Sequence, residues 1–129
     1  MKLNLKELNP GAWFTFPKGS GKVKLRICSP GELIKIRKQT VGDGVEYVEG
    51  KRFEYQNTDS DLERELMWDY CIMDWKDIND AEGNPIPCNK EMKILLMGES
   101  PEVLRLVSDG LDKLVKHAAA SKVALEKNS

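Results

Sequence analysis

The spacing of apolar residues changes from alternation in the N-terminal half of the chain to steps of three and four in the C-terminal half. Val23, Leu25 and Ile27 alternate with basic residues, and they follow an aromatic-rich stretch at 13–16 across a turn at 17–21. Such alternation is typical of a strand that buries one face. It predicts an antiparallel hairpin with one apolar face and one basic face. The basic residues of the second strand are Lys22, Lys24 and Arg26.

Turn-forming residues predict a short helix and a second hairpin in the next thirty or so residues. Ser29 and Glu32 form a capping box with Pro30 at the first helical position, so a helix begins here and ends before Gly42. We expect a turn over residues 42–44 and then a more polar hairpin that folds back over residues 49–51. The strand-favouring residues of this hairpin are Val45, Tyr47, Phe53 and Tyr55.

The stretch 67–92 is the predicted centre of the fold, because a helix, an irregular turn and a second helix meet there. The first helix begins at a capping box of Ser60 and Glu63, and its apolar positions continue to Met73. The helical period fails from Asp74 onward, which predicts a loop with a reverse turn at 79–84 and an extended Pro-x-Pro segment at 85–87. The apolar residues of the helix are Leu62, Leu66, Met67, Tyr70, Cys71 and Met73.

Two further helices follow this loop. Asn89 is a favourable N-cap for the first, and Gly98 is expected to close it. The longest helix begins at Ser100, and its apolar seam must be buried either on the domain or on another chain. After Ala118 the chain has few large apolar residues, and residues 119–129 are expected to be a frayed tail. The seam consists of Leu104, Val107, Leu111 and Leu114.

Together these elements predict an α+β fold in which N-terminal antiparallel β-hairpins pack with three to four α-helices. We expect one domain over residues 1–129, because no repeat or linker divides the chain. Within it, 1–56 should hold the hairpins and a short helix, and 57–118 should be mainly helical with the Trp75 loop.

Composition narrows the functional classes. Charged residues make up 32% of the 129 residues and the net charge is −1, so no global charge favours nucleic acid or membrane. An odd number of cysteines, three, fits reduced thiols better than a disulfide framework. Neither a signal-peptide pattern nor an apolar run of membrane-spanning length occurs, so we expect a soluble, intracellular protein.

Metal and catalytic sites are not predicted. Cys28, Cys71, Cys88 and His117 have the composition of a zinc site, but structural zinc ligands usually come in closely spaced pairs and these four do not. The acidic loop lacks the ligand spacing of a calcium-binding loop. His117 has no nucleophile or carboxylate beside it in sequence, and neither a Gly-x-Ser-x-Gly motif nor a phosphate-binding glycine loop occurs. We therefore expect no cofactor and no enzymatic activity. The acidic residues of the loop are Asp74, Asp77, Asp80 and Glu82.

In residues 60–118 a helix leads into an Asp-Trp-x-x-Ile segment at 74–78, an acidic glycine turn at Gly83, a Pro-x-Pro segment at 85–87, a polar cap at Asn89 and two helices. This combination of motifs resembles the tail assembly chaperones of tailed bacteriophages. It implies a non-catalytic cytoplasmic protein that binds the tape measure protein and the tail tube protein, is a possible homo-oligomer, and is not expected in the mature virion. The residues that carry the resemblance are Asp74, Trp75, Ile78, Gly83, Pro85, Pro87, Asn89, Glu91, Leu95 and Leu96.

Partner binding is expected at apolar positions of the loop and of the longest helix. The seam is equally a candidate core face, and for Trp75 an anchor of the core is expected ahead of partner binding. The alternative function is a small nucleic-acid-binding module that uses the basic strand Lys22, Lys24 and Arg26, with the neighbouring aromatics expected mainly in the core. The family resemblance also implies that a longer frameshifted form can exist, with 126–128 as a possible slip site. The candidate partner-binding residues are Trp75, Ile78, Leu104, Val107, Leu111 and Leu114.

Overall fold

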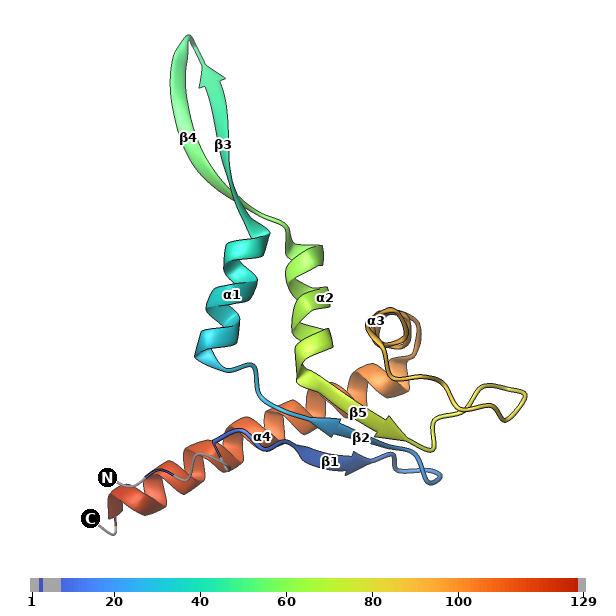
Figure 1. Cartoon of the computed structure of the whole chain (residues 1–129). Coiled ribbons are helices and arrows are strands. Elements are labelled where there is room, and N and C mark those ends of the chain that lie inside the picture. Colours follow the sequence, from blue (N-terminus) through green and yellow to red (C-terminus); the bar gives the residue numbers. More distant parts are fainter. Residues whose placement is uncertain (1–2, 4–7, 128–129) are drawn as a thin grey trace. The chain divides into compact units, whose positions relative to one another are not determined.

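A computed structural model of the chain describes Leu3 and residues 8–127, with the side chains beyond Ala118 excluded (Figure 1). The chain forms two compact units. The first unit contains the residues up to Ile27 and those from Trp68 onward, and the second contains Cys28–Met67. Both units mix helices with antiparallel strands, which confirms the α+β class.

A three-stranded antiparallel sheet is the centre of the first unit. Its order is β1 (Ala12–Thr15), β2 (Lys22–Leu25) and β5 (Ile72–Lys76). The predicted first hairpin is confirmed as β1–β2, and the alternation of β2 places Val23 and Leu25 in the core while its lysines lie on the opposite face. The sequence pattern therefore correctly identified the buried face of this hairpin.

Strand β5 replaces an element that was predicted wrongly. The helix expected to reach Met73 is α2 (Ser60–Cys71), and the loop expected from Asp74 begins instead with strand β5. Ile72 pairs with Leu25 and Trp75 with Val23, so both side chains are buried although they are three positions apart. A register shift between Lys24 and Leu25 makes this possible, because it disturbs the simple two-residue alternation.

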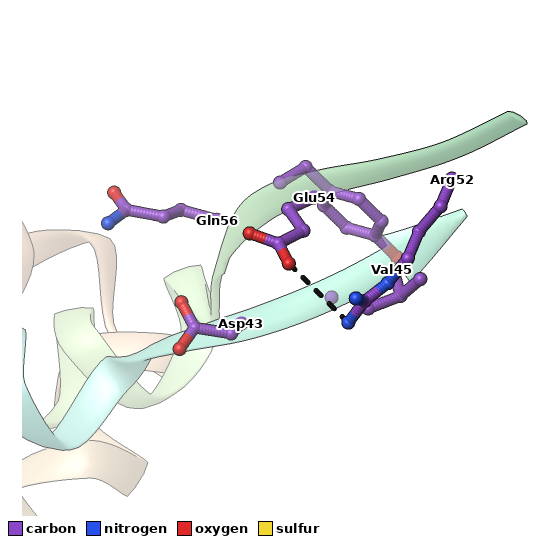
Figure 2. A pocket seen from close by; sticks show the side chains of 7 residues that line it. Asp43, Val45, Arg52, Glu54 and Gln56 are labelled. Carbon is purple, nitrogen blue, oxygen red and sulfur yellow. Dashed lines mark ion pairs between the residues drawn. The ribbon is translucent and has the colours of Figure 1, made fainter. Parts of the chain in front are cut away.

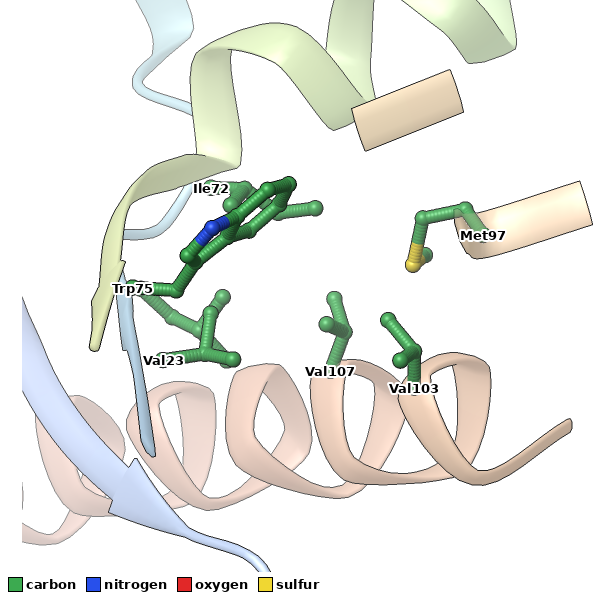
Figure 3. Close-up of a cluster of buried hydrophobic side chains, with 7 residues drawn as sticks. Val23, Ile72, Trp75, Met97, Val103 and Val107 are labelled. Atoms are coloured by element: carbon green, nitrogen blue, oxygen red, sulfur yellow. The ribbon is translucent and has the colours of Figure 1, made fainter. Parts of the chain in front are cut away.

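The core of the first unit lies between this sheet and helices α3 (Lys90–Glu99) and α4 (Pro101–Lys127) (Figure 3). Helix α4 approaches the sheet closely at Gly110, where an added Cβ would lie 2.7 Å from Leu25 Cδ1 and 3.1 Å from the Phe14 ring. Gly110 therefore provides room for helix and sheet to meet. The buried residues of this core are Val23, Leu25, Ile72, Trp75, Met97, Val103 and Val107.

The helix caps largely follow the sequence. Asn89 Oδ1 accepts a hydrogen bond from Met92 N at 2.9 Å, and Ser100 Oγ accepts one from Val103 N at 3.3 Å. Gly98 was predicted to end α3, and this prediction was wrong. The helix continues to Glu99, and Ser100 ends it by donating its N–H to Leu96 O. Ser100 therefore serves both helices, and no glycine is needed.

The backbone of α4 remains helical to Lys127, where a frayed tail was expected after Ala118. The side chains of that segment and residues 128–129 lie outside the described residues. The possible slip site at 126–128 therefore stays a prediction about the gene.

The second unit contains helix α1 (Pro30–Thr40), the hairpin of β3 (Val41–Val48) and β4 (Lys51–Thr58), and the first two turns of α2. Ser29 Oγ accepts from Glu32 N at 3.2 Å, which confirms the first predicted cap. The cap of α2 is Asp59 rather than Ser60, because Asp59 Oδ1 accepts from Leu62 N at 3.1 Å.

The predicted second hairpin is confirmed but is longer than expected. The expected turn at 42–44 lies inside β3, where the backbone pairs continuously with β4. The chain reverses at Glu49 (φ 52°) and Gly50 (φ 78°), and two successive positive φ values are typical of the type I′ turn of two-residue hairpins.

Candidate protein-binding surfaces

The β3–β4 hairpin carries a concentration of exposed large apolar side chains. Tyr47 is the most exposed of them, at 70%. Monomeric proteins rarely expose many large apolar residues together unless they contact another molecule. The hairpin surface is defined by Val45, Tyr47, Val48, Phe53 and Tyr55.

Both faces of the hairpin are apolar in part. Cross-strand partners lie on the same face, so the pairing of Glu46 with Phe53 and of Val48 with Lys51 places Phe53, Val48 and Tyr55 together. The opposite face carries Val45 and Tyr47.

A salt bridge accompanies the apolar residues of the second face. Arg52 Nη2 lies 3.4 Å from Glu54 Oε1 on the same strand (Figure 2). Gly44 leaves room for the Tyr55 ring, because a Cβ at position 44 would collide with it. An open hollow lies along the hairpin, and residues of both strands line it: Asp43, Gly44, Val45, Arg52, Glu54, Tyr55 and Gln56.

The hairpin is incomplete as a sheet. No third strand pairs with either edge within the described part of the chain. An isolated two-stranded hairpin is marginally stable in water, and an unpaired edge is a template for pairing with another chain. Exposed apolar side chains and free edges occur here on one element, which makes it the strongest candidate binding surface of the second unit.

The predicted seam of α4 divides between core and surface. Val107 is 1% exposed and belongs to the core, whereas Leu104 is 41% exposed. Leu111 and Leu114 are partly buried against the core. The buried face instead begins with Val103, one residue before the predicted seam. Of the four seam residues, Leu104 is therefore the one whose side chain is exposed enough to contact a partner.

Trp75 and Ile78 have structural positions. Trp75 is 7% exposed and its Nε1 donates to Ile86 O at 2.7 Å, and Ile78 packs partly buried against the core. Ile86 N in turn donates to Ile78 O at 2.9 Å, and Asn79 and Pro85 form an isolated bridge, so the loop is the expected hairpin-like turn. The indole has little surface left for a partner, so Trp75 is placed as the anchor of the core.

A second surface feature is the basic face of the three-stranded sheet. Trp13 was expected in the core but is 37% exposed, with Lys76 Nζ 4.9 Å and Lys22 Nζ 5.3 Å from its ring centroid. Cations at this distance attract the aromatic ring electrostatically. Arg26 lies 3.8 Å from the centroid of the Tyr70 ring. Phe14 and Phe16 pack against the core as expected.

The described residues contain no group of three or more histidine, cysteine or acidic side chains placed to hold a metal ion. In the acidic loop, Asp80 Oδ1 accepts from the N–H groups of Glu82 at 3.0 Å and Asn84 at 2.9 Å, so this carboxylate shapes the turn. Burial raises the pKa of the Cys28 and Cys88 thiols. Raised pKa values disfavour the thiolate, which is the reactive form of cysteine.

Comparison of the chain with protein-family models, with curated proteins and with solved structures finds no match in any of the three. None of the helices in the described part of the chain combines the length and the apolar character needed to cross a membrane.

Proposed function

We propose that the chain is a non-catalytic tail assembly chaperone of a tailed bacteriophage. In this function it binds the tape measure protein and the tail tube protein in the cytoplasm of the host cell and is absent from the finished virion. The support from sequence is the resemblance in residues 60–118. The observation that carries the proposal is the β3–β4 hairpin surface, with its large apolar side chains exposed on both faces.

An assembly chaperone must bind apolar segments that would otherwise associate with each other before the tail is built. A hairpin with apolar side chains and free edges can offer both side-chain contacts and main-chain hydrogen bonds to an extended segment.

Co-production with the tape measure protein of the same phage genome tests the proposal. The wild-type chain should co-purify with that protein and raise its soluble yield. Tyr47→Ser combined with Phe53→Ser should abolish both effects while leaving the helical circular dichroism unchanged, since both side chains are exposed.

Ile34→Ser on α1 is the matched control, because it removes an exposed apolar side chain from another element. Binding that survives the double substitution, or is lost equally in the control, would refute the assignment to the hairpin. No co-purification of the wild-type chain would refute the chaperone function.

A nucleic-acid-binding function is the second candidate, and the exposed Trp13 with Lys22 and Lys76 beside it favours it. Aromatic rings beside cations are typical of surfaces that stack bases and neutralise phosphates. Labelled single-stranded DNA should then bind in a salt-sensitive manner, and Lys24→Glu should abolish binding. Lys38→Glu on α1 is the charge-matched control. Equal effects of the two substitutions would indicate only a general charge effect.

A further inference from the structure

Along β4, alternate residues point their backbone N–H and C=O groups toward the outer edge of the hairpin. In a two-residue type I′ hairpin, the residues that flank the turn form a hydrogen-bonded pair, here Val48 and Lys51. Hydrogen-bonded pairs then recur at every second position along the hairpin, and the next is Glu46 with Phe53. The N–H and C=O groups of Arg52 and Glu54 therefore point away from β3, toward the free edge.

The two edges of the hairpin differ in charge. Strand β3 carries the acidic residues Asp43 and Glu46 and no basic residue. Strand β4 carries Lys51, Arg52 and Glu54, so it has both signs. A second copy that pairs through β3 would oppose acidic strands, whereas pairing through β4 can oppose unlike charges.

Two β4 edges can pair antiparallel only in registers that place the outward-pointing residues of one copy opposite those of the other, and few registers do so. When Phe53 lies opposite Phe53 of the second copy, Arg52 of each copy forms a hydrogen-bonded pair with Glu54 of the other. The registers on either side place Glu54 opposite Glu54 or Arg52 opposite Arg52, which is destabilising. Only the register centred on Phe53 pairs both charges with their opposites.

We propose that two copies of this chain pair antiparallel through β4, with Phe53 on the two-fold axis. The product is a four-stranded sheet in the order β3-β4-β4-β3. Phe53, 51% exposed in the single chain, then meets Phe53 of the second copy, and the existing Arg52–Glu54 pair becomes part of a ring of four alternating charges. The interface is isologous, so it closes as a dimer and does not extend into a fibre.

Charge reversal tests the register in the full chain without any client. Arg52→Glu and Glu54→Arg each place like charges opposite each other twice, so each should weaken dimerisation about tenfold or more. The double variant, with both charges exchanged, should restore the wild-type dissociation constant. Asp43→Arg on β3 is the control and should leave it unchanged. The measurement is sedimentation velocity over a range of concentrations.

Disulfide trapping gives an independent measurement. Under mild oxidation, Phe53→Cys should yield a covalent dimer, because directly opposed residues in such a pair have closely spaced Cβ atoms. Tyr47→Cys on β3 should yield no more dimer than the wild-type chain, whose three native cysteines set the baseline. A monomeric wild-type chain, a double variant that is not restored, or equal trapping at both positions would each overturn the proposal.

Discussion

Removal of the Trp75 indole is the most direct test of how the first unit is held together. The side chain is 7% exposed, lies opposite Val23 in the sheet and belongs to the core cluster (Figure 3). Its Nε1 also donates to Ile86 O at 2.7 Å, which connects β5 to the Pro-x-Pro segment. Trp75→Ala would remove both the packing and this hydrogen bond.

The expected magnitude follows from these two contributions. Truncation of a buried Trp to Ala costs about 3–5 kcal/mol of unfolding free energy through lost burial and the remaining cavity. Trp75→Phe keeps most of the aromatic packing but leaves Ile86 O without its donor, so it should cost only about 1–2 kcal/mol. Trp13→Ala in the same sheet is the control, because the Trp13 ring is 37% exposed, and its cost should stay below about 1 kcal/mol.

Urea denaturation followed by far-ultraviolet circular dichroism measures all three variants without relying on the fluorescence of the residue removed. The order of stability loss should be Trp75→Ala, then Trp75→Phe, then Trp13→Ala. A loss below about 1 kcal/mol for Trp75→Ala, or one equal to that of Trp13→Ala, would refute the role of Trp75 as an anchor.

Three further predictions concern the same unit. Gly110→Ala should lower the unfolding free energy by about 1–3 kcal/mol despite the better helix propensity of Ala, because the new Cβ would lie 2.7 Å from Leu25 Cδ1 and 3.1 Å from the Phe14 ring. Thermal unfolding should show this loss, and a stabilised variant would contradict it. Lys93 is 8% exposed, and its Nζ donates to Asp69 O at 3.0 Å and to Asp69 Oδ1 at 3.2 Å. Lys93→Met should therefore lower the unfolding free energy by about 1–2 kcal/mol, measured by urea titration. An unchanged urea midpoint would argue against this role of Lys93. Burial raises the pKa of Cys88, so the folded state favours the protonated thiol: this stability is present at neutral pH and is lost as pH rises past the ordinary thiol pKa of about 8.5. Wild type should therefore lose more stability between neutral and alkaline pH than Cys88→Ala, and identical pH profiles would contradict this.

Local rules predicted the elements that depend on neighbouring residues. Ser29 and Asn89 cap helices as expected because an N-cap needs only a side-chain oxygen within reach of a backbone N–H three residues on. Glu49 and Gly50 reverse the second hairpin because their positive φ values match the twist of two antiparallel strands. Such signals lie within a few residues, so one sequence is enough to read them.

Strand β5 could not be predicted in this way. Ile72 and Trp75 are three positions apart, a spacing that indicates a helical face and not a strand. Their common burial depends on the register shift opposite Lys24 and Leu25, which are almost fifty residues away in the chain. The sheet thus overrides the local pattern, because pairing with β2 satisfies the backbone of residues 72–76 and buries two large side chains at once.

The same distinction between local and distant information explains the outcome for the binding surfaces. Helical spacing correctly predicts that Val107 has to be covered, but it does not say by what, and the sheet of the first unit covers it. In the second unit, Tyr47 and Phe53 were assigned to strands but not to a site, because strand-favouring residues are usually buried by other parts of the same chain. The available signal was that large apolar residues occur on both faces of one hairpin. Packing on one side can cover only one face of a two-stranded sheet. When both faces carry apolar side chains, the other face and the two edges stay exposed, and a second chain can cover them.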